Sequence, residues 1–157
     1  LRPGALVLCL QNGVDNAERL RAVLPQHAVA AAVVYVAREL GGAAPLPQHA
    51  RAELVSEPGG GGEAAARALA AAGVATEISS DVRAALWQKL LLNAAYNAVS
   101  AIAQLPYGET VRGEGIPEVM RDVVDECLAV AQAEGVRLDG EAIKGAVGKL
   151  GQSMPSQ

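Results

Sequence analysis

The sequence contains no phenylalanine, only two cysteines and two histidines, and 3% aromatic residues. Cys9 and Cys127 lie far apart in apolar surroundings, which argues against a disulfide framework and predicts buried thiols in a reducing, cytoplasmic compartment. His27 and His49 have no cysteine or second histidine at zinc-ligand spacing, so we expect no metal. No stretch reaches the roughly 18 uninterrupted apolar residues of a membrane span, and no secretory signal is visible.

Positive charge is also scarce. The formal net charge is −4 and lysines and arginines stand singly, so we expect no nucleic-acid partner. Hydrophobic residues, by contrast, make up 51% of the chain and charged residues 19%, which predicts a packed core and excludes disorder. A length of 157 residues allows one large domain or two small ones.

The first half of the chain alternates between strand-like and helix-like segments. Apolar runs predict four strands, the first two of them buried on both faces: 5–10, 28–37, 51–56 and 74–78. Asn16 is expected to cap a short helix that Pro25 ends, and an alanine-rich helix is expected over 63–72. This order is typical of the later portion of an α/β sheet.

From about residue 79 onward the hydrophobic period becomes helical. A cap at Ser80 or Asp81 begins a long helix that ends before Pro106. Two further helices are predicted, one over 117–134 and one capped by Asp139. We therefore expect an α/β part followed by an all-α part, with the domains at 1–79 and 80–157.

Gly59 to Ala64 reads GGGGEA, which formally fits the G-x-G-x-x-G/A dinucleotide fingerprint. Four consecutive glycines match almost any glycine pattern, and Pro58 interrupts the passage from strand to loop. We interpret the stretch as a flexible loop. The segment Gln11-Asn12-Gly13 follows the first strand at the edge where open α/β sheets bind ligands, but Asn-Gly is also ordinary turn chemistry, which the residues alone favour.

The long helix carries Lys89, Asn93 and Asn97 at a spacing of four residues. At about 100° of rotation per residue, the three side chains project from one stripe. An unpaired buried amide costs about 1–3 kcal/mol, so the stripe should have hydrogen-bond partners. The residues leave two interpretations open: a substrate site in which the lysine donates a proton, or a polar seam between helices. Acidic residues at 122, 125 and 126 are interpreted as a solvated face of the next helix.

Four stretches together resemble the ketopantoate reductase (2-dehydropantoate 2-reductase) family: LQNGV (10–14), VVYVAREL (33–40), PQHARAELV (47–55) and WQKLLLNAAYNAVSAI (87–102). The last is similar to the signature W-x-K-L-x-x-N-x-x-x-N that opens the family's helical domain, and His49 matches a histidine of its returning strand. The resemblance implies the remnant of a Rossmann-type domain followed by the family's helical C-terminal domain.

Carried over by position, the resemblance also implies roles for single residues. Asn12 would lie beside the cofactor and substrate. Lys89 would be the general acid, giving a proton to the keto oxygen as NADPH delivers hydride to the carbon. Asn93 and Asn97 would hydrogen-bond a 2-keto acid substrate, and Ser153 would be a further substrate ligand.

The implied reaction is the NADPH-dependent reduction of 2-dehydropantoate to (R)-pantoate, toward pantothenate and coenzyme A. The chain begins Leu1-Arg2-Pro3-Gly4, and we expect it to be a piece of a longer protein, incomplete at both ends and not a competent reductase alone. The sheet edge at 5–10 would invite pairing with another chain, and a homodimer is kept as a candidate assembly. Two alternatives remain: a reductase of another branched 2-keto acid, and a non-catalytic helical oligomerisation module.

Overall fold

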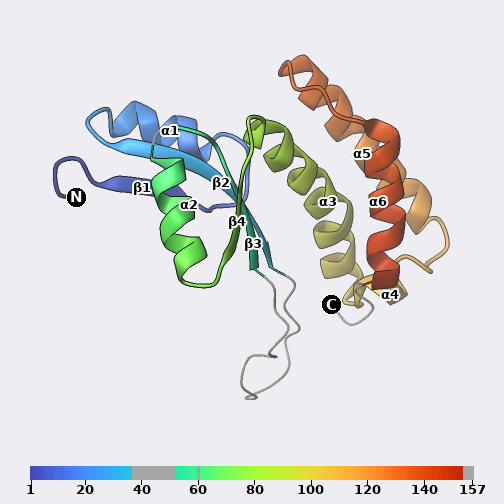
Figure 1. The fold of residues 1–157 in the computed structure, drawn as a ribbon. Coiled ribbons are helices and arrows are strands. Elements are labelled where there is room, and N and C mark those ends of the chain that lie inside the picture. The colour runs from blue at the N-terminus through green and yellow to red at the C-terminus, as the bar shows by residue number, and fades with distance from the viewer. Residues whose placement is uncertain (37–51, 60, 154–157) are drawn as a thin grey trace. The chain divides into compact units, whose positions relative to one another are not determined.

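The computed structural model describes residues 1–36, 52–59 and 61–153 (Figure 1). The chain divides into two compact units, Leu1–Leu86 and Trp87–Gln157. Three predicted features lie outside the described residues: the strand ends at residues 37 and 51, the turn between those two ends, and His49. Within the described part of the chain, no helix combines the length and apolarity needed to cross a membrane.

The first unit is a four-stranded sheet with two helices, in the order β1-β2-β3-β4. Its strands are β1 (Leu6–Cys9), β2 (Ala28–Val36), β3 (Ala52–Ser56) and β4 (Ala75–Ile78), and its helices are α1 (Asn16–Val23) and α2 (Gly62–Ala71). Helix α1 connects the parallel pair β1 and β2, α2 connects the parallel pair β3 and β4, and β2 and β3 pair antiparallel. The predicted alternation of strands and helices is confirmed.

The core of this unit is centred on β2. Val29, Ala31 and Val33 are buried there together with Cys9 of β1 and Val82, the first residue of helix α3 (Val82–Ala103). Because the first turn of α3 packs into this core, the compact unit extends to Leu86. A domain boundary at residue 79 stays a prediction.

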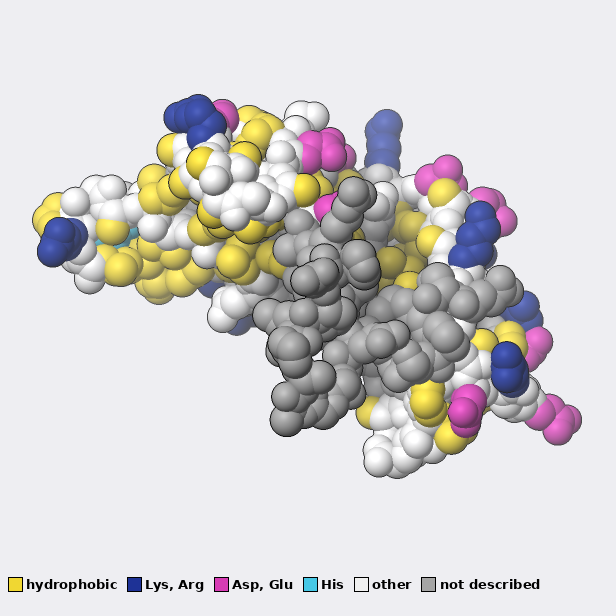
Figure 2. Space-filling view, turned by 60° about the horizontal axis from the view of Figure 1, so that its bottom comes forward, with side chains coloured by type: hydrophobic (Ala, Val, Ile, Leu, Met, Phe, Trp, Pro, Cys, Tyr) yellow, Lys and Arg dark blue, Asp and Glu magenta, His cyan; other side chains and the backbone are white. Residues whose placement is uncertain are grey.

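Strand β1 is more exposed than we predicted. Leu6 is 38% exposed, and Cys9 is the only residue of β1 that is buried. The prediction of burial on both faces is wrong for this strand, because β1 stands at one edge of the four-stranded sheet. Figure 2 accordingly shows hydrophobic side chains at the surface of the first unit, on the left of the view.

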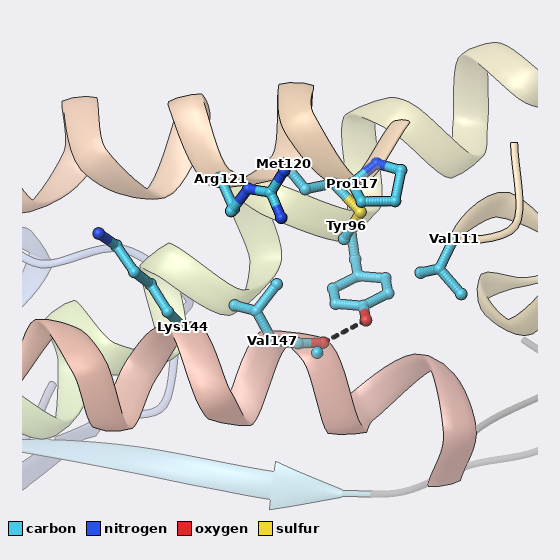
Figure 3. Close-up of a pocket in the computed structure, with 8 residues that line it drawn as sticks. Tyr96, Val111, Pro117, Met120, Arg121, Lys144 and Val147 are labelled. Atoms are coloured by element: carbon cyan, nitrogen blue, oxygen red, sulfur yellow. Dashed lines mark hydrogen bonds between the residues drawn. The ribbon is translucent and has the colours of Figure 1, made fainter. Parts of the chain in front are cut away.

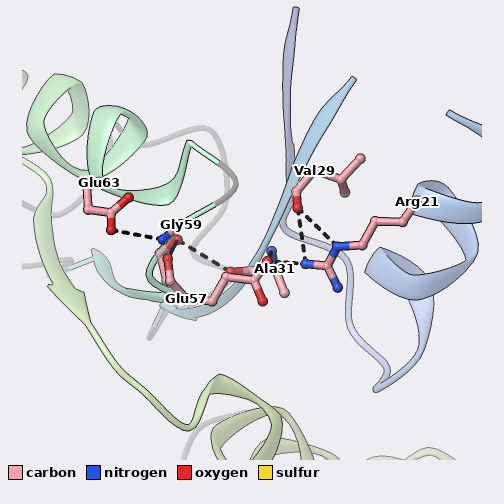
Figure 4. Close-up of polar contacts among 7 residues, drawn as sticks. Arg21, Val29, Ala31, Glu57, Gly59 and Glu63 are labelled. Carbon is pink, nitrogen blue, oxygen red and sulfur yellow. Dashed lines mark hydrogen bonds and ion pairs between the residues drawn. The ribbon is translucent and has the colours of Figure 1, made fainter. Parts of the chain in front are cut away.

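Strand β2 changes partner midway, and the side chain of Glu57 marks that point (Figure 4). Its first residues pair with β1 up to Ala31, and the next residues pair with β3. The Glu57 carboxylate accepts the backbone N–H of Ala31 at 2.8 Å and pairs with the guanidinium of Arg21. Arg21 also donates to the carbonyl of Val29 at 3.1 and 3.2 Å, so α1, β2 and the end of β3 are tied together.

The described glycines at the start of α2 are closely packed. A Cβ on Gly62 would lie 2.1 Å from the carbonyl oxygen of Glu57, and one on Gly61, where φ is +92°, would lie 2.5 Å from Leu6 Cδ1. The Glu63 carboxylate accepts the N–H of Gly59 at 2.9 Å, and this bond lowers the pKa of Glu63. The flexible loop predicted over this stretch stays a prediction.

The second unit is helical throughout its described elements. It contains α3 from Trp87 onward, α4 (Tyr107–Thr110), α5 (Ile116–Ala133) and α6 (Gly140–Ser153). The caps predicted for α3 and α6 are confirmed, because Asp81 accepts the N–H of Ala84 and Asp139 accepts the N–H of Ala142, each at 3.0 Å. The predicted cap at Asn16 is wrong, because Asp15 holds the N-cap position of α1 and Asn16 is the first residue of that helix. The short helix α4 was not predicted; it lies where α3 and α6 end (Figure 1).

One acidic residue that we interpreted as part of a solvated face has a structural partner. Asp125 of α5 accepts from Lys144 Nζ of α6 at 2.7 Å, and Glu141 lies 3.7 Å from the same nitrogen. The Asp125 side chain is still 56% exposed, so the pair contributes little to the free energy of unfolding. Its role is to join α5 to α6.

Candidate functional site

The polar stripe predicted on α3 lies apart from a buried apolar stripe on the same helix. The buried stripe is at most 5% exposed and also has a spacing of four: Trp87, Leu91 and Ala95. Lys89 and Asn93 are half-buried and Asn97 is exposed. Eight residues separate Lys89 from Asn97, which corresponds to about 12 Å along the helix axis. A helix face of this length and polarity can contact both ends of a small molecule.

Burial alters the acidity of the lysine in this stripe. The partial loss of water around Lys89 lowers the pKa of its ammonium group. A lowered pKa makes the ammonium a stronger acid, which is the direction that proton donation requires. The role of Lys89 as a proton donor stays a prediction.

Asn97 has a specific partner that brings a second helix into the site. Its Oδ1 accepts a hydrogen bond from the hydroxyl of Tyr107, in α4, at 2.6 Å. The Tyr107 ring packs on the Tyr96 ring with their centroids 4.7 Å apart and an angle of 43° between the planes. Asn97, Tyr107 and Tyr96 thus form one connected group at the end of α3.

Tyr96 continues this group into α6. Its hydroxyl donates to the carbonyl of Val147 and accepts the N–H of Gly151 at 2.9 Å. In an uninterrupted α-helix the N–H of Gly151 would bond to the carbonyl of Val147. The Tyr96 hydroxyl therefore takes the place of one backbone hydrogen bond of α6. Burial of the ring raises the pKa of Tyr96, which keeps the hydroxyl protonated.

The Tyr96 ring also forms part of the wall of a cavity of about 300 Å³ between α3, α5 and α6 (Figure 3). The other residues that line it are Val111, Pro117, Met120, Arg121, Lys144, Val147 and Gly148. Of the two cations, Arg121 pairs with Glu118 and Lys144 with Asp125.

The remaining predicted site residues lie in two places. Ser153 is the last residue of α6, two residues beyond Gly151, so the chain at Ser153 lies near the end of the helix that Tyr96 holds. Asn12 belongs to the first unit, where it is exposed in the turn after β1. Its carbonyl accepts from the Asn16 amide at 2.8 Å, which gives the turn between β1 and α1 a fixed shape.

The interpretation of the sequence missed both tyrosines of this group. Tyr96 was given no role, and Pro106-Tyr107-Gly108 was interpreted only as a helix break. The signal that was present is an aromatic residue with a hydroxyl directly after the proline that ends the long helix. Only the packing of α4 shows that Tyr107 faces Asn97.

The packing at Gly151 gives a testable prediction. A Cβ there would lie 2.9 Å from Val111 Cγ1 and 3.1 Å from the Tyr96 hydroxyl. We expect Gly151→Ala to lower the free energy of unfolding by about 1–3 kcal/mol through overpacking. The matched control is Gly145→Ala in the same helix, where no atom lies within 4 Å and alanine should stabilise by about 0.5–1 kcal/mol. Chemical denaturation of both variants checks the pair, and equal effects would contradict the assigned contact.

Two family models match most of the chain. The model described as "Ketopantoate reductase PanE/ApbA" matches residues 1–55, and that described as "Ketopantoate reductase PanE/ApbA C terminal" matches residues 81–157. The chain belongs to the ketopantoate reductase family. The two matched segments correspond to the α/β part and the helical part, so the predicted family and fold class are confirmed.

Similar proteins agree with this membership. The chain is 33% identical over 150 residues to 2-dehydropantoate 2-reductase of Mycobacterium tuberculosis, covering 96% of this chain and 50% of that protein. It is 55% identical to a ketopantoate reductase of the PanE/ApbA family from Ralstonia eutropha, whose solved structure matches with a TM-score of 0.88, covering 100% of this chain and 52% of that one. The chain therefore spans about half the length of these ketopantoate reductases.

A more distant structure shares the fold alone. D-mandelate dehydrogenase, solved in complex with NADH, matches with a TM-score of 0.75 at 20% identity, covering 91% of this chain and 50% of that one. At this identity the match adds nothing about substrate.

Proposed function

We propose that the protein carrying this chain reduces 2-dehydropantoate to (R)-pantoate with NADPH, and that the polar stripe of α3 is the substrate side of its active site. The observation that carries the proposal is the half-buried Lys89, whose pKa is lowered, on the same stripe as Asn93 and Asn97. The α3 signature and the family membership support the substrate class. Because the chain spans about half of its relatives, the activity is proposed for the whole protein.

The chemistry of the step matches the residue types. A reduced nicotinamide, when bound, supplies the hydride. As the keto carbon gains the hydride, the carbonyl oxygen becomes an alkoxide and needs a proton. The Lys89 ammonium stabilises that charge and transfers a proton to the oxygen, which leaves a neutral amine to be reprotonated from water. Asn93 and Asn97 offer amide donors that would hold the substrate against this face, and Ser153 is proposed as a further ligand.

The described residues fit a cofactor contact in one place and not in another. Asn12 presents an exposed amide at the carboxyl end of β1, the edge where open α/β sheets bind ligands, and we propose it as a contact to the cofactor. The glycine turn after β3 does not fit a phosphate, because the Glu63 carboxylate already accepts the Gly59 N–H. No part of the proposed reaction depends on that turn.

Two further parts of the proposal concern the setting of the protein. A cytoplasmic location in the pathway to pantothenate and coenzyme A is supported by unpaired Cys9 and Cys127, the second with a pKa raised by burial. A homodimer is supported by the ketopantoate reductase of Staphylococcus aureus, which is described as dimeric and shares the fold at 20% identity.

The experiment is a turnover assay on the protein expressed from its complete reading frame and on residues 1–157 alone. We expect the former to oxidise NADPH with 2-dehydropantoate, to prefer that substrate over other branched 2-keto acids, and to prefer NADPH over NADH. Equal rates on several keto acids would replace the substrate assignment with a broader reductase. No turnover and no keto-acid binding would favour a non-catalytic helical module.

The same assay tests what residues 1–157 can do alone. We expect no turnover from this chain, because its described residues do not provide a complete cofactor site. Steady turnover at the rate of the whole protein would show that the chain is sufficient.

A further inference from the structure

Asn97 contacts Tyr107 through the oxygen of its amide and not through the nitrogen. We propose that Tyr107 is a positioning residue, which fixes the Asn97 amide so that its NH2 group is presented to an oxygen of the 2-oxo acid at the end away from the keto group. The inference rests on the proposed function, because it assigns a role in binding that function's substrate. It adds to the site a residue that does not touch the reacting atoms.

The hydrogen bond determines which way the amide points. Tyr107 has one hydroxyl proton and donates it to Asn97 Oδ1 at 2.6 Å. The two N–H donors of the amide then lie on the other side of the group. With the amide reversed, the hydroxyl would accept from the NH2 group and its own proton would need another acceptor. The observed arrangement satisfies both partners at once.

The donor itself is held rigidly. The Tyr107 ring packs on Tyr96, which is 1% exposed and anchored to α6 by two hydrogen bonds. Pro106 precedes the short helix, and its carbonyl accepts both the backbone N–H and the hydroxyl of Thr110, each at 2.9 Å. The χ2 torsion of an asparagine side chain otherwise has a broad distribution. Fixing it in the free protein reduces the conformational entropy that is lost when the substrate binds.

The orientation suits an oxygen that accepts hydrogen bonds, because the amide presents its N–H groups. Asn97 is exposed, which leaves room for a ligand. Lys89 lies about 12 Å away along α3, so the ligand group at this end of the stripe is an oxygen of the 2-oxo acid remote from the keto oxygen.

The test is Tyr107→Phe in the protein expressed from its complete reading frame. Phenylalanine keeps the ring contact with Tyr96 and removes only the donor. We expect the KM for the keto acid to rise about 3–10-fold, as for loss of one hydrogen bond, with kcat within about twofold and the midpoint of thermal unfolding unchanged. The matched control is Glu109→Gln, an exposed change in the same short helix, which should alter neither constant.

A double-mutant cycle separates positioning from a general structural role. In the Asn97→Ala background, Tyr107→Phe should have no further effect on KM, because the group that it orients is absent. An unchanged KM in the single variant, or an equal rise in both backgrounds, would overturn the inference while leaving the reductase activity in place. A wild-type protein that turns over no keto acid would instead overturn the proposed function, and this inference with it.

Discussion

Replacing Lys89 with methionine is expected to lower kcat for keto-acid reduction by about 10²–10⁴-fold, the usual contribution of a positioned general acid. Methionine keeps an unbranched side chain of similar length, so the helix and the half-buried position are preserved. Only the proton and the positive charge are lost. The measurement is the rate of NADPH oxidation at saturating keto acid, with Gln88→Ala, an exposed neighbour in α3, as the matched control.

The pH dependence distinguishes proton donation from mere binding. A general acid must be protonated, so kcat should fall as the pH rises through the pKa of Lys89, which burial lowers from the ordinary 10.5. The basic limb of the profile is therefore expected below that value and should be absent from the residual activity of Lys89→Met. A wild-type profile that is flat up to pH 10.5, or a variant within tenfold of the wild-type rate, would contradict this role.

Lys89→Met is also expected to change the free energy of unfolding in a definite direction. The unfolded chain holds the Lys89 proton more tightly than the folded protein does, because burial lowers the folded pKa. Below the folded pKa the charged lysine therefore costs stability, and this cost disappears as the pH rises from that pKa toward 10.5. Lys89→Met should be at least as stable as the wild type at pH 7, as measured by thermal unfolding. A residue kept at a cost in stability is typical of a functional site.

Replacing Tyr96 with alanine is expected to lower the free energy of unfolding by about 3–5 kcal/mol, the range for removing a large aromatic side chain from a core. Tyr96 is 1% exposed, contacts Tyr107 and bonds to two backbone groups of α6. Its loss would leave a cavity beside Met120 and separate α4 from its support. Chemical denaturation measures the change.

Two further variants make the Tyr96 experiment specific. Ile102→Ala removes a side chain that is 85% exposed in the same helix, and it should change the free energy of unfolding by no more than about 0.5 kcal/mol. Tyr96→Phe should cost only about 1 kcal/mol, because the carbonyl of Val147 and the N–H of Gly151 can then bond to each other. A cost for Tyr96→Ala as small as that for Ile102→Ala would contradict the proposed support.

Local physical chemistry was sufficient to predict most elements. The apolar runs gave the strands, because a buried strand needs consecutive apolar residues. Asp81 and Asp139 were identifiable as caps, since a short carboxylate at a helix start can accept a free backbone N–H. The stripe at Lys89, Asn93 and Asn97 was also visible, because a spacing of four on a helix places side chains on one face wherever the helix packs.

What the sequence by itself determined is therefore the list of elements, the family and the residues on the polar stripe. The tertiary structure alone decided that Glu57 marks the change of partner in β2 and that the Tyr107 hydroxyl donates to Asn97. Each of these depends on groups distant in the chain meeting in space. A hydrogen bond between residues ten positions apart, across a helix break, leaves no periodic trace in the sequence.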